Sequence, residues 1–409
     1  MNTVLVISIG QSPDPCFASV QQHSAGRVIF FASQETRGTV TDIERLLERR
    51  GELVALEQDD EYDFGRCYKT AREAIRKALD VPEPRRIVVD ITGGTKTMTA
   101  ALALAASDHQ LEFAYVVSEK HPDGKFKHNS EKVKPFANPL HTYHTRELER
   151  LQSSFNAGDF RATLETIKTI LERSQNDYDK RFYTELERLV KAFEAWDLFD
   201  HSKASDMFQK ALRELKTLSD AKPDSPWHAW IRQLEALQPE LEQLKMAKKE
   251  PSMVLLQDLL ANADRRIERG EYDDAVARLY RAVGLYLEIL LTEAGVKIEE
   301  TRYTLPEKAV GVMQKFREHQ RKGRNVLELS SIPDMAKLAA QLEPHKGAAL
   351  WRSLEEGKLG SILKKRNQSI LAHGVQPIGK ELAEGLRHAL LEEFDLQSKP
   401  IWMPMPKLI

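Results

Sequence analysis

The stretch "DITGGTKTMTAALALAA", residues 90–106, places a glycine-rich turn between an apolar strand and a helix of small residues. Gly93 and Gly94 allow close backbone approach and a positive φ. Thr95 adds a hydroxyl and Lys96 a positive charge, and the following helix directs free N–H groups at the same place. The turn matches neither G-x-x-x-x-G-K-[ST] nor G-x-G-x-x-G. It therefore predicts a different phosphate cradle, or only a tight connection between strand and helix.

The sequence before residue 119 alternates between short apolar runs and helical patterns. We expect strands at 4–9, 27–33, 52–57, 86–92 and 111–118, with helices between them that include 39–50, 65–80 and 97–109. Apolar strands separated by helices predict a parallel sheet covered on both faces. This is a doubly wound, Rossmann-like α/β domain. The polar stretch 119–139 is expected to form a hairpin and an exit linker.

A second polar loop, "SIGQSPDP" at residues 8–15, follows the first strand. In a doubly wound sheet the first strand is central, and ligands bind where the strand order reverses. If the fourth strand neighbours the first, this loop and the glycine turn form one anion-binding rim. Because Lys96 supplies a single positive charge, we expect hydrogen bonding to a phosphodiester rather than a triphosphate clamp.

The rest of the chain reads as helical, with no convincing strand beyond residue 141. Two segments, 155–173 and 199–215, resemble each other loosely, and each has the pattern of a tetratricopeptide-like hairpin. The similarity is too weak to predict a repeat array. A break near residue 248 precedes a second helical block. Its expected helices are 254–269, 272–294, 305–320, 334–342, 347–372 and 379–395.

The second helical block contains the run "LGSILKKRNQSILAHGVQPIG" at 359–379. Arg366 and His373 fall on the helix face that Leu359, Ile362, Leu363 and Ile370 make apolar. They are separated by about two turns, roughly 10 Å. An arginine on a packing face is costly unless it is paired or lines a cleft. Arginine and histidine suit metal-free cleavage of RNA, whose 2′-hydroxyl is the nucleophile. The alternative is an Arg366 salt bridge with His373 as a helix cap.

Composition excludes several classes of protein. The 409 residues are 41% hydrophobic and 30% charged with a net charge of −2, so any nucleic-acid site is local. Two cysteines exclude a disulfide framework and a cysteine zinc site, and we expect no metal site. No apolar run approaches a membrane span, and the N-terminus reads as a strand rather than a signal peptide, so we expect a cytoplasmic protein. The acidic stretch 57–63 reads as a solvated loop.

The pattern D-x-T-G-G-T-K-x-M resembles the second motif of CARF domains, the sensors of type III CRISPR systems, and "ISIGQSPDP" (7–15) is similar to the first. The resemblance implies that a dimer of these domains binds a cyclic oligoadenylate across its two-fold axis. Met98 opens a helix and is equally expected in the core. The implied ligand-facing residues are Gly10, Gln11, Ser12, Thr92, Gly93, Gly94, Thr95, Lys96 and Met98.

The run "RNQSILAH" (366–373) is similar to the R-x4–6-H signature of HEPN nucleases, and 271–291 looks like the opening helix of such a domain. HEPN domains pair, so that two Arg–His sets form one site. The resemblance implies that Arg366 and His373 are catalytic and that Asn367 positions them. Two upstream lysines either hold RNA phosphates or are simply solvated; these are Lys364 and Lys365.

A CARF domain followed by a HEPN domain is the arrangement of the type III CRISPR-associated ancillary ribonucleases. We therefore expect a CARF-like sensor (1–140), a helical linker or insert (141–250), and an all-α HEPN domain (251–409). The implied function is a homodimeric, metal-independent endoribonuclease without cofactors, which cleaves single-stranded RNA to 2′,3′-cyclic phosphates. Cyclic oligoadenylate is the implied allosteric activator in antiviral defence.

The alternative is a non-catalytic, cyclic-oligonucleotide-binding regulator or scaffold in which Arg366 and His373 are structural. Ring size, RNA base preference and degradation of the activator by the sensor stay open.

Overall fold

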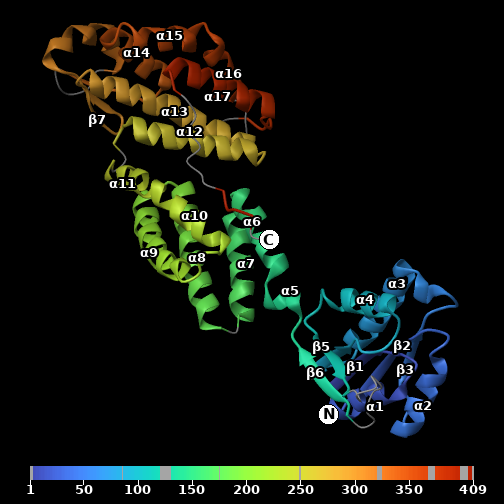
Figure 1. The fold of residues 1–409 in the computed structure, drawn as a ribbon. Coiled ribbons are helices and arrows are strands. Elements are labelled where there is room, and N and C mark those ends of the chain that lie inside the picture. Colours follow the sequence, from blue (N-terminus) through green and yellow to red (C-terminus); the bar gives the residue numbers. More distant parts are fainter. Residues whose placement is uncertain are drawn as a thin grey trace. The chain divides into compact units, whose positions relative to one another are not determined.

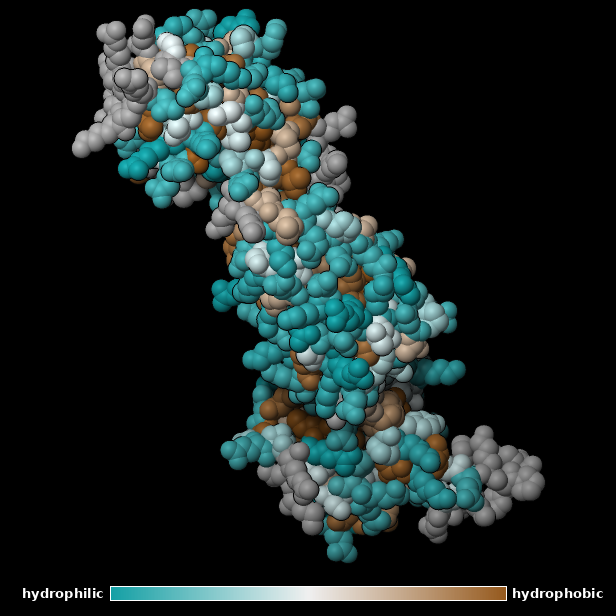
Figure 2. Space-filling model, turned by 90° about the vertical axis from the view of Figure 1, so that its left-hand side faces the viewer, coloured by the Kyte–Doolittle hydropathy of each residue, from teal (hydrophilic) through white to brown (hydrophobic). Residues whose placement is uncertain are grey.

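The computed structural model describes residues 3–84, 86–119, 130–174, 176–247, 250–319, 325–366, 374–396 and 404–407. The chain divides into two compact units, Met1–Arg146 and Glu147–Ile409 (Figure 1). Figure 2 shows a face on which hydrophilic residues dominate and hydrophobic residues form small patches. No helix in the described ranges combines the length and the hydropathy that a bilayer crossing requires.

The first unit contains a six-stranded sheet in the order β3-β2-β1-β4-β5-β6. The strands are β1 (Thr3–Ser8), β2 (Arg27–Ala32), β3 (Glu52–Ala55), β4 (Arg86–Asp90), β5 (Glu112–Val117) and β6 (Lys132–Phe136). The first five pair in parallel, and β6 pairs antiparallel with β5. The five expected strands are confirmed. The sixth lies in the stretch 119–139 that was expected to form a hairpin and an exit linker, and its antiparallel pairing with β5 agrees with a hairpin. Its bounds were not predicted, because an exposed edge strand with two lysines and a proline lacks an apolar pattern.

Helices cover both faces of this sheet. They are α1 (Pro13–Gln22), α2 (Arg37–Leu47), α3 (Phe64–Leu79) and α4 (Lys96–Ala106), with a 3₁₀ turn, η1 (Asp60–Tyr62), and a short α5 (Pro139–Thr142). Alternate strand residues face opposite sides: Leu5 and Ile7 pack with α1 and α2, whereas Val4 and Val6 pack with α3 and α4. All six residues of β1 are buried, as a strand covered on both faces requires. The expected doubly wound, Rossmann-like domain is confirmed.

The strand order reverses at β1. Val6 pairs with Ile29 of β2 on one side and with Val89 of β4 on the other. The expected neighbourhood of the first and fourth strands is thus confirmed. The loops that follow β1 and β4 consequently leave the same edge of the sheet, which is where doubly wound folds bind ligands.

The second unit begins with helices around an aromatic core. They are α6 (Thr145–Asn156), α7 (Phe160–Arg173), α8 (Asp177–Asp197), α9 (His201–Asp220), α10 (Pro226–Leu234), η2 (Glu235–Leu237) and α11 (Gln238–Met246). Phe155 lies at the centre, with its ring against Phe160, Phe193 and Trp230 at 5.2–6.0 Å between centroids. Edge-to-face packing of this kind favours one arrangement of the helices.

The second half of this unit is also mainly helical. Its elements are α12 (Met253–Glu268), α13 (Tyr272–Glu293), β7 (Lys297–Glu299), β8 (Arg302–Thr304), η3 (Glu307–His319), β9 (Val326–Glu328), α14 (Ile332–Leu342), α15 (Lys346–Glu355), α16 (Lys358–Arg366) and α17 (Lys380–Phe394). The expectation of no strand beyond residue 141 is wrong for β7, β8 and β9, which form a small antiparallel sheet. Three-residue strands are too short to show an alternating pattern.

Two expected helices have a different form. The stretch expected as a helix at 305–320 is a 3₁₀ segment with a kink at Phe316. The helix expected at 347–372 is divided into α15 and α16, and residues 367–372 lie outside the described residues. Gly357 and Gly360 explain the division, because a Cβ on Gly360 would lie 1.9 Å from the Leu354 carbonyl oxygen. The chain therefore makes a tight break between the two helices at positions where only glycine fits.

A buried ionic cluster joins α8 to α12. Asp197, at the end of α8, lies 2.9 Å from Arg265, 2.5 Å from Arg266 and 3.2 Å from Arg269. Its backbone carbonyl accepts a hydrogen bond from the Asn262 amide at 2.8 Å. Burial raises the pKa of the Asp197 carboxyl, but the three guanidinium groups outweigh burial and hold it below its usual value. The cluster thus ties the two halves of this unit together through charge.

Replacing Asp197 by Asn should lower the free energy of unfolding by about 1–3 kcal/mol at pH 7, because the arginines lose the carboxylate that they share. Arg266 keeps Glu271 at 3.1 Å and Asp274 at 3.0 Å, which limits the loss. A carboxyl whose folded-state pKa is lowered stabilises the fold above its unfolded value, near 3.8. The difference between wild type and variant should therefore shrink as pH falls below that value. Urea denaturation across pH measures it.

The matched control is Asp206→Asn, which removes an exposed carboxylate 2.8 Å from Lys245. It should leave stability nearly unchanged. Equal effects of the two substitutions would contradict the role given to the cluster.

Candidate functional site

The glycine turn and the loop after β1 meet through their backbones. A Cβ on Gly93 would lie 2.5 Å from the Ser8 carbonyl oxygen and 2.6 Å from the Gly10 nitrogen. The Ser8 hydroxyl donates a hydrogen bond to the Gly93 carbonyl at 2.6 Å. Gly94 adopts a φ of +88°, which disfavours other residues. The two expected loops therefore form one continuous backbone surface.

Asp90 holds the glycine turn in place through hydrogen bonds. Its buried carboxylate accepts hydrogen bonds from the Ser19 hydroxyl at 2.5 Å and from the Thr92 backbone N–H at 2.8 Å. Burial raises the pKa of Asp90, although these hydrogen bonds oppose the rise. The Thr92 hydroxyl donates to the same carboxylate and accepts from the Val116 N–H at 2.7 Å. The Thr92 hydroxyl and backbone N–H are thus both engaged in hydrogen bonds within the fold.

The sequence interpretation had not assigned a role to Asp90 or Ser19. Asp90 was visible as a lone acid at the end of an apolar strand, but its partner Ser19 is 71 residues away in the sequence.

The N-terminus of α4 opens onto the same surface. Thr95 is the N-cap, and its hydroxyl accepts from the Met98 N–H at 3.2 Å. Lys96 is exposed and follows directly. Met98 is fully buried in the core, with its sulfur 3.4 Å from where a Cβ on Gly94 would lie. The structure therefore places Met98 as a support beneath the turn.

The loop after β1 contributes exposed groups. Gln11 and Ser12 are exposed, and Gly10 is half-buried against Gly93 and Gly94. Ser12 occupies the N-cap position of α1 without a side-chain hydrogen bond to that helix. The N-terminal ends of α1 and α4 thus open at one edge of the sheet. A phosphodiester placed there would meet the free N–H groups of α4 and one lysine. The first turn of α1 offers fewer donors, because it contains Pro13, Asp14 and Pro15.

The acidic stretch 57–63 also lies at this edge. The expectation of a solvated loop agrees with the exposed residues Glu57, Gln58, Asp59, Tyr62 and Asp63. It is wrong for Asp60 and Glu61, which are only 8% and 4% exposed. They belong to η1, which packs against the beginning of α4. The Glu61 carbonyl accepts from the Thr95 hydroxyl at 3.5 Å. A long-range contact with α4, invisible in the sequence, buries this turn.

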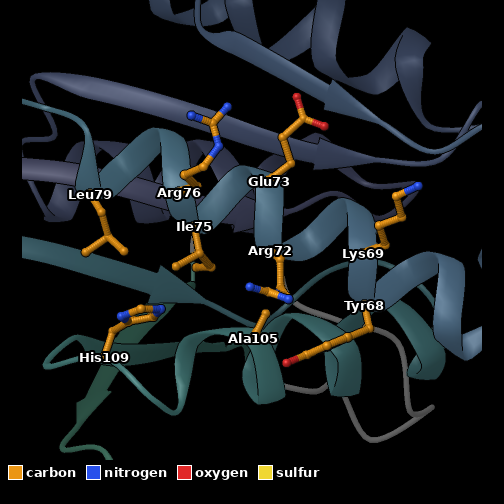
Figure 3. A pocket seen from close by; sticks show the side chains of 9 residues that line it. All are labelled: Tyr68, Lys69, Arg72, Glu73, Ile75, Arg76, Leu79, Ala105 and His109. Atoms are coloured by element: carbon orange, nitrogen blue, oxygen red, sulfur yellow. The ribbon is translucent and has the colours of Figure 1, made fainter.

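The first unit also has a surface groove of about 420 Å³ between α3 and α4 (Figure 3). Residues of both helices line it, among them Tyr68, Arg72 and Ala105. None of the expected ligand-facing residues does. The groove lies along the two helices, whereas the glycine turn and its donors form a backbone surface at the strand ends. That backbone surface is the candidate ligand site.

The candidate catalytic arginine closes α16. The Arg366 guanidinium lies 4.1 Å from the centre of the Tyr280 ring on α13, a cation–π distance. Lys364 is exposed on the same helix, and the side chain of Lys365 is not described. Asn367 and His373 lie outside the described residues. The helix expected to open a HEPN domain therefore contacts the first residue of the Arg–His run.

The same helix also holds the chain that follows this run. The Ile378 N–H donates to the Asp273 carboxylate at 3.2 Å, in the first turn of α13. Described residues before and after the Arg–His run are thus both attached to α13.

Replacing Gly93 by Ala should lower the free energy of unfolding by about 1–3 kcal/mol, because the new methyl overlaps two backbone atoms that cannot rotate away. The control is Gly38→Ala in α2, where nothing lies within 4 Å of a Cβ. That change should be neutral or stabilising. Chemical denaturation compares the two variants, and an unaffected Gly93→Ala protein would disprove the close contact.

Comparisons with known proteins bear on both halves of the chain. Residues 143–241 match the family model of the Csm6 6H domain, and residues 244–397 match that of the Csm6 HEPN domain. The chain is 24% identical over 414 residues to the CRISPR system endoribonuclease Csm6 of Thermus thermophilus, covering 97% of this chain and 86% of that protein.

One solved structure shares the fold over nearly the whole chain. Enterococcus italicus Csm6 bound to cyclic hexa-2′-fluoro-hexa-dAMP superposes with a TM-score of 0.55 at 13% identity, over 98% of this chain and 97% of that one. Can2 from Sulfobacillus thermosulfidooxidans in complex with cyclic tetra-adenylate gives a TM-score of 0.25 at 14% identity, over 54% and 68%. On the two family models and the Thermus relative, the chain belongs to the type III CRISPR-associated family of CARF–HEPN ancillary ribonucleases.

Proposed function

We propose that this protein is an endoribonuclease of type III CRISPR defence that cleaves single-stranded RNA when a cyclic oligoadenylate binds its first unit. The observation that carries the proposal is the Arg366–His373 run inside the Csm6 HEPN match at 244–397. The Thermus relative is named an endoribonuclease, and the Enterococcus structure holds a cyclic hexanucleotide analogue. We retain the division into 1–140, 141–250 and 251–409 as part of this proposal.

The backbone surface at the strand ends suits a phosphodiester. Free N–H groups of α4 and the Lys96 ammonium supply positive potential without the several charges that a triphosphate demands. A homodimer would present two copies of this surface around one axis, and a cyclic ligand has the matching symmetry. The residues proposed to face the ligand are Gly10, Gln11, Ser12, Thr92, Gly93, Gly94, Thr95 and Lys96.

Cleavage in the second unit would use the RNA's own nucleophile. The 2′-oxygen loses its proton as it forms a bond to phosphorus, the bond from phosphorus to the 5′-oxygen breaks, and the proton passes to the departing oxygen. His373 would transfer that proton, and Arg366 would stabilise the charge on the reacting phosphate. Asn367 would position both. Lys364 and Lys365 would hold flanking phosphates. The products are a 2′,3′-cyclic phosphate and a 5′-hydroxyl, and the scheme needs no metal.

The second candidate function is a cyclic-oligonucleotide-binding regulator or scaffold. It is favoured by the Arg366–Tyr280 contact, because a stacked arginine is also a structural device. The two candidates differ in whether His373 is needed for any activity on RNA.

The deciding measurement is a fluorogenic single-stranded RNA assay in EDTA, without activator and then with cyclic tri-, tetra-, penta- and hexa-adenylate. Wild type should cleave with one ring size, and His373→Ala should lower the rate at least about 100-fold, since it removes the proton-transfer group. His388→Ala, an exposed histidine beside Glu392 on α17, is the control and should retain the rate. Binding of a ring without cleavage would favour the regulator.

Tyr280 should position Arg366 for cleavage. Tyr280→Leu removes the ring and should lower kcat and kcat/KM equally, by about 2- to 30-fold, because the arginine acts only in the transition state. Tyr280→Phe keeps the ring and should retain most activity. Steady-state kinetics separates these outcomes. A change in KM alone would instead assign Tyr280 to RNA binding.

A further inference from the structure

Tyr62 is an exposed aromatic residue beside the proposed ligand surface. Its side chain is 72% exposed, although it stands in a turn whose two preceding residues, Asp60 and Glu61, are buried. The Glu61 carbonyl lies 3.5 Å from the hydroxyl of Thr95, the N-cap of α4. Because neighbouring Cα atoms are about 3.8 Å apart, the backbone of Tyr62 lies one residue beyond this contact with the N-cap that follows the glycine turn. It is therefore placed at the rim of the cradle.

The turn that carries Tyr62 is fixed on both sides. Asp60 is held by the Arg66 guanidinium at 2.6 Å, and its carbonyl accepts from the Cys67 thiol at 3.3 Å. Asp63 caps α3 by accepting from the Arg66 N–H at 3.0 Å. Tyr62 is thus an apolar ring on a rigid support. A ring held in this way loses little conformational entropy when a ligand packs on it.

We propose that Tyr62 is a base-stacking residue of the ligand site and that η1 forms a third wall of that site, beside the loops after β1 and β4. The inference rests on the proposed function, in which the turn binds the phosphodiesters. In a nucleotide the sugar separates the base from the phosphate, so a base lies beside a phosphate cradle rather than in it. An aromatic ring at the rim meets the π-face of that base. The ligand class is a cyclic oligonucleotide whose bases point away from its phosphate ring.

The chain offers a matched control in Tyr143. It is also 72% exposed and lies in the first unit. It follows α5, whose N-cap Asn138 donates to the carbonyls of Ser107 and His109 at the C-terminal end of α4. Tyr62 and Tyr143 therefore mark opposite ends of one helix of 11 residues, about 16 Å long.

The experiment is calorimetric titration of the full-length protein with cyclic tri-, tetra-, penta- and hexa-adenylate, for wild type, Tyr62→Ala, Tyr62→Leu, Tyr62→Phe and Tyr143→Ala. Tyr62→Ala should weaken binding of the ring that wild type prefers by at least about fivefold, the lower end of one lost stack. Tyr62→Phe should bind within about twofold of wild type, and Tyr143→Ala should bind as wild type does. Thermal denaturation confirms that each variant is folded.

Each outcome has one meaning. Wild-type affinity in Tyr62→Ala would overturn the stacking role while leaving the sensor function in place. Equal affinities of the Leu and Phe variants would overturn it too, because stacking needs a ring and not only apolar area. Absence of binding of all four rings by wild type would overturn the sensor function itself, together with this inference. Loss in Ala and Leu with retention in Phe establishes Tyr62 as a stacking residue.

Discussion

The contact of Gly93 with the backbone of Ser8 and Gly10 is the constraint on which the first unit depends. A methyl group on Gly93 would lie 2.5 Å from the Ser8 carbonyl oxygen, which is too close. The segments after β1 and β4 therefore contact each other through their backbones. This contact sets where α4 begins and therefore where its free N–H groups point. The surface that results is made of main-chain atoms, which bind an anion of any kind. Selection among ligands has to come from side chains outside the turn.

The elements of this unit that the sequence predicted are those whose environment shows in their own residues. β1 and β4 were predictable because a strand buried on both faces is apolar throughout, and the glycine pair marked the turn. For β6 the sequence predicted a hairpin but not the bounds of the strand, since its charged residues lie on an exposed edge and form no apolar pattern. η1 was misread because nothing local shows that Asp60 is neutralised by Arg66 or that α4 covers the turn. Local sequence patterns were informative where a strand is buried on both faces. They failed where residues far away in the sequence bury or pair a charged stretch.

In the second unit, too, the sequence predicted the helices but not the charge interactions between them. Its helices were predictable from apolar periodicity, and their ends agree closely for α12 and α13. The cluster around Asp197 was not, because its arginines lie 68–72 residues away along the chain and look like an ordinary charged helix face. For the candidate catalytic run, the sequence named Arg366 but could not name Tyr280, whose ring is brought to it only by the packing of α13.

The rigidity of the turn has a consequence for the proposed activation. A ligand shifts an equilibrium only by its difference in affinity for the two states, and a change from 1:99 to 99:1 needs about 5.5 kcal/mol of difference. A turn locked by Gly93 and held from below by buried Asp90 offers the same donors in both states. The contacts between this turn and the ligand, however strong, add the same affinity to both states. They therefore do not shift the equilibrium between the inactive and the active state. The difference must therefore arise from groups whose position relative to the ligand changes, and in a symmetric pair these are the contacts that depend on how the two copies approach each other around it.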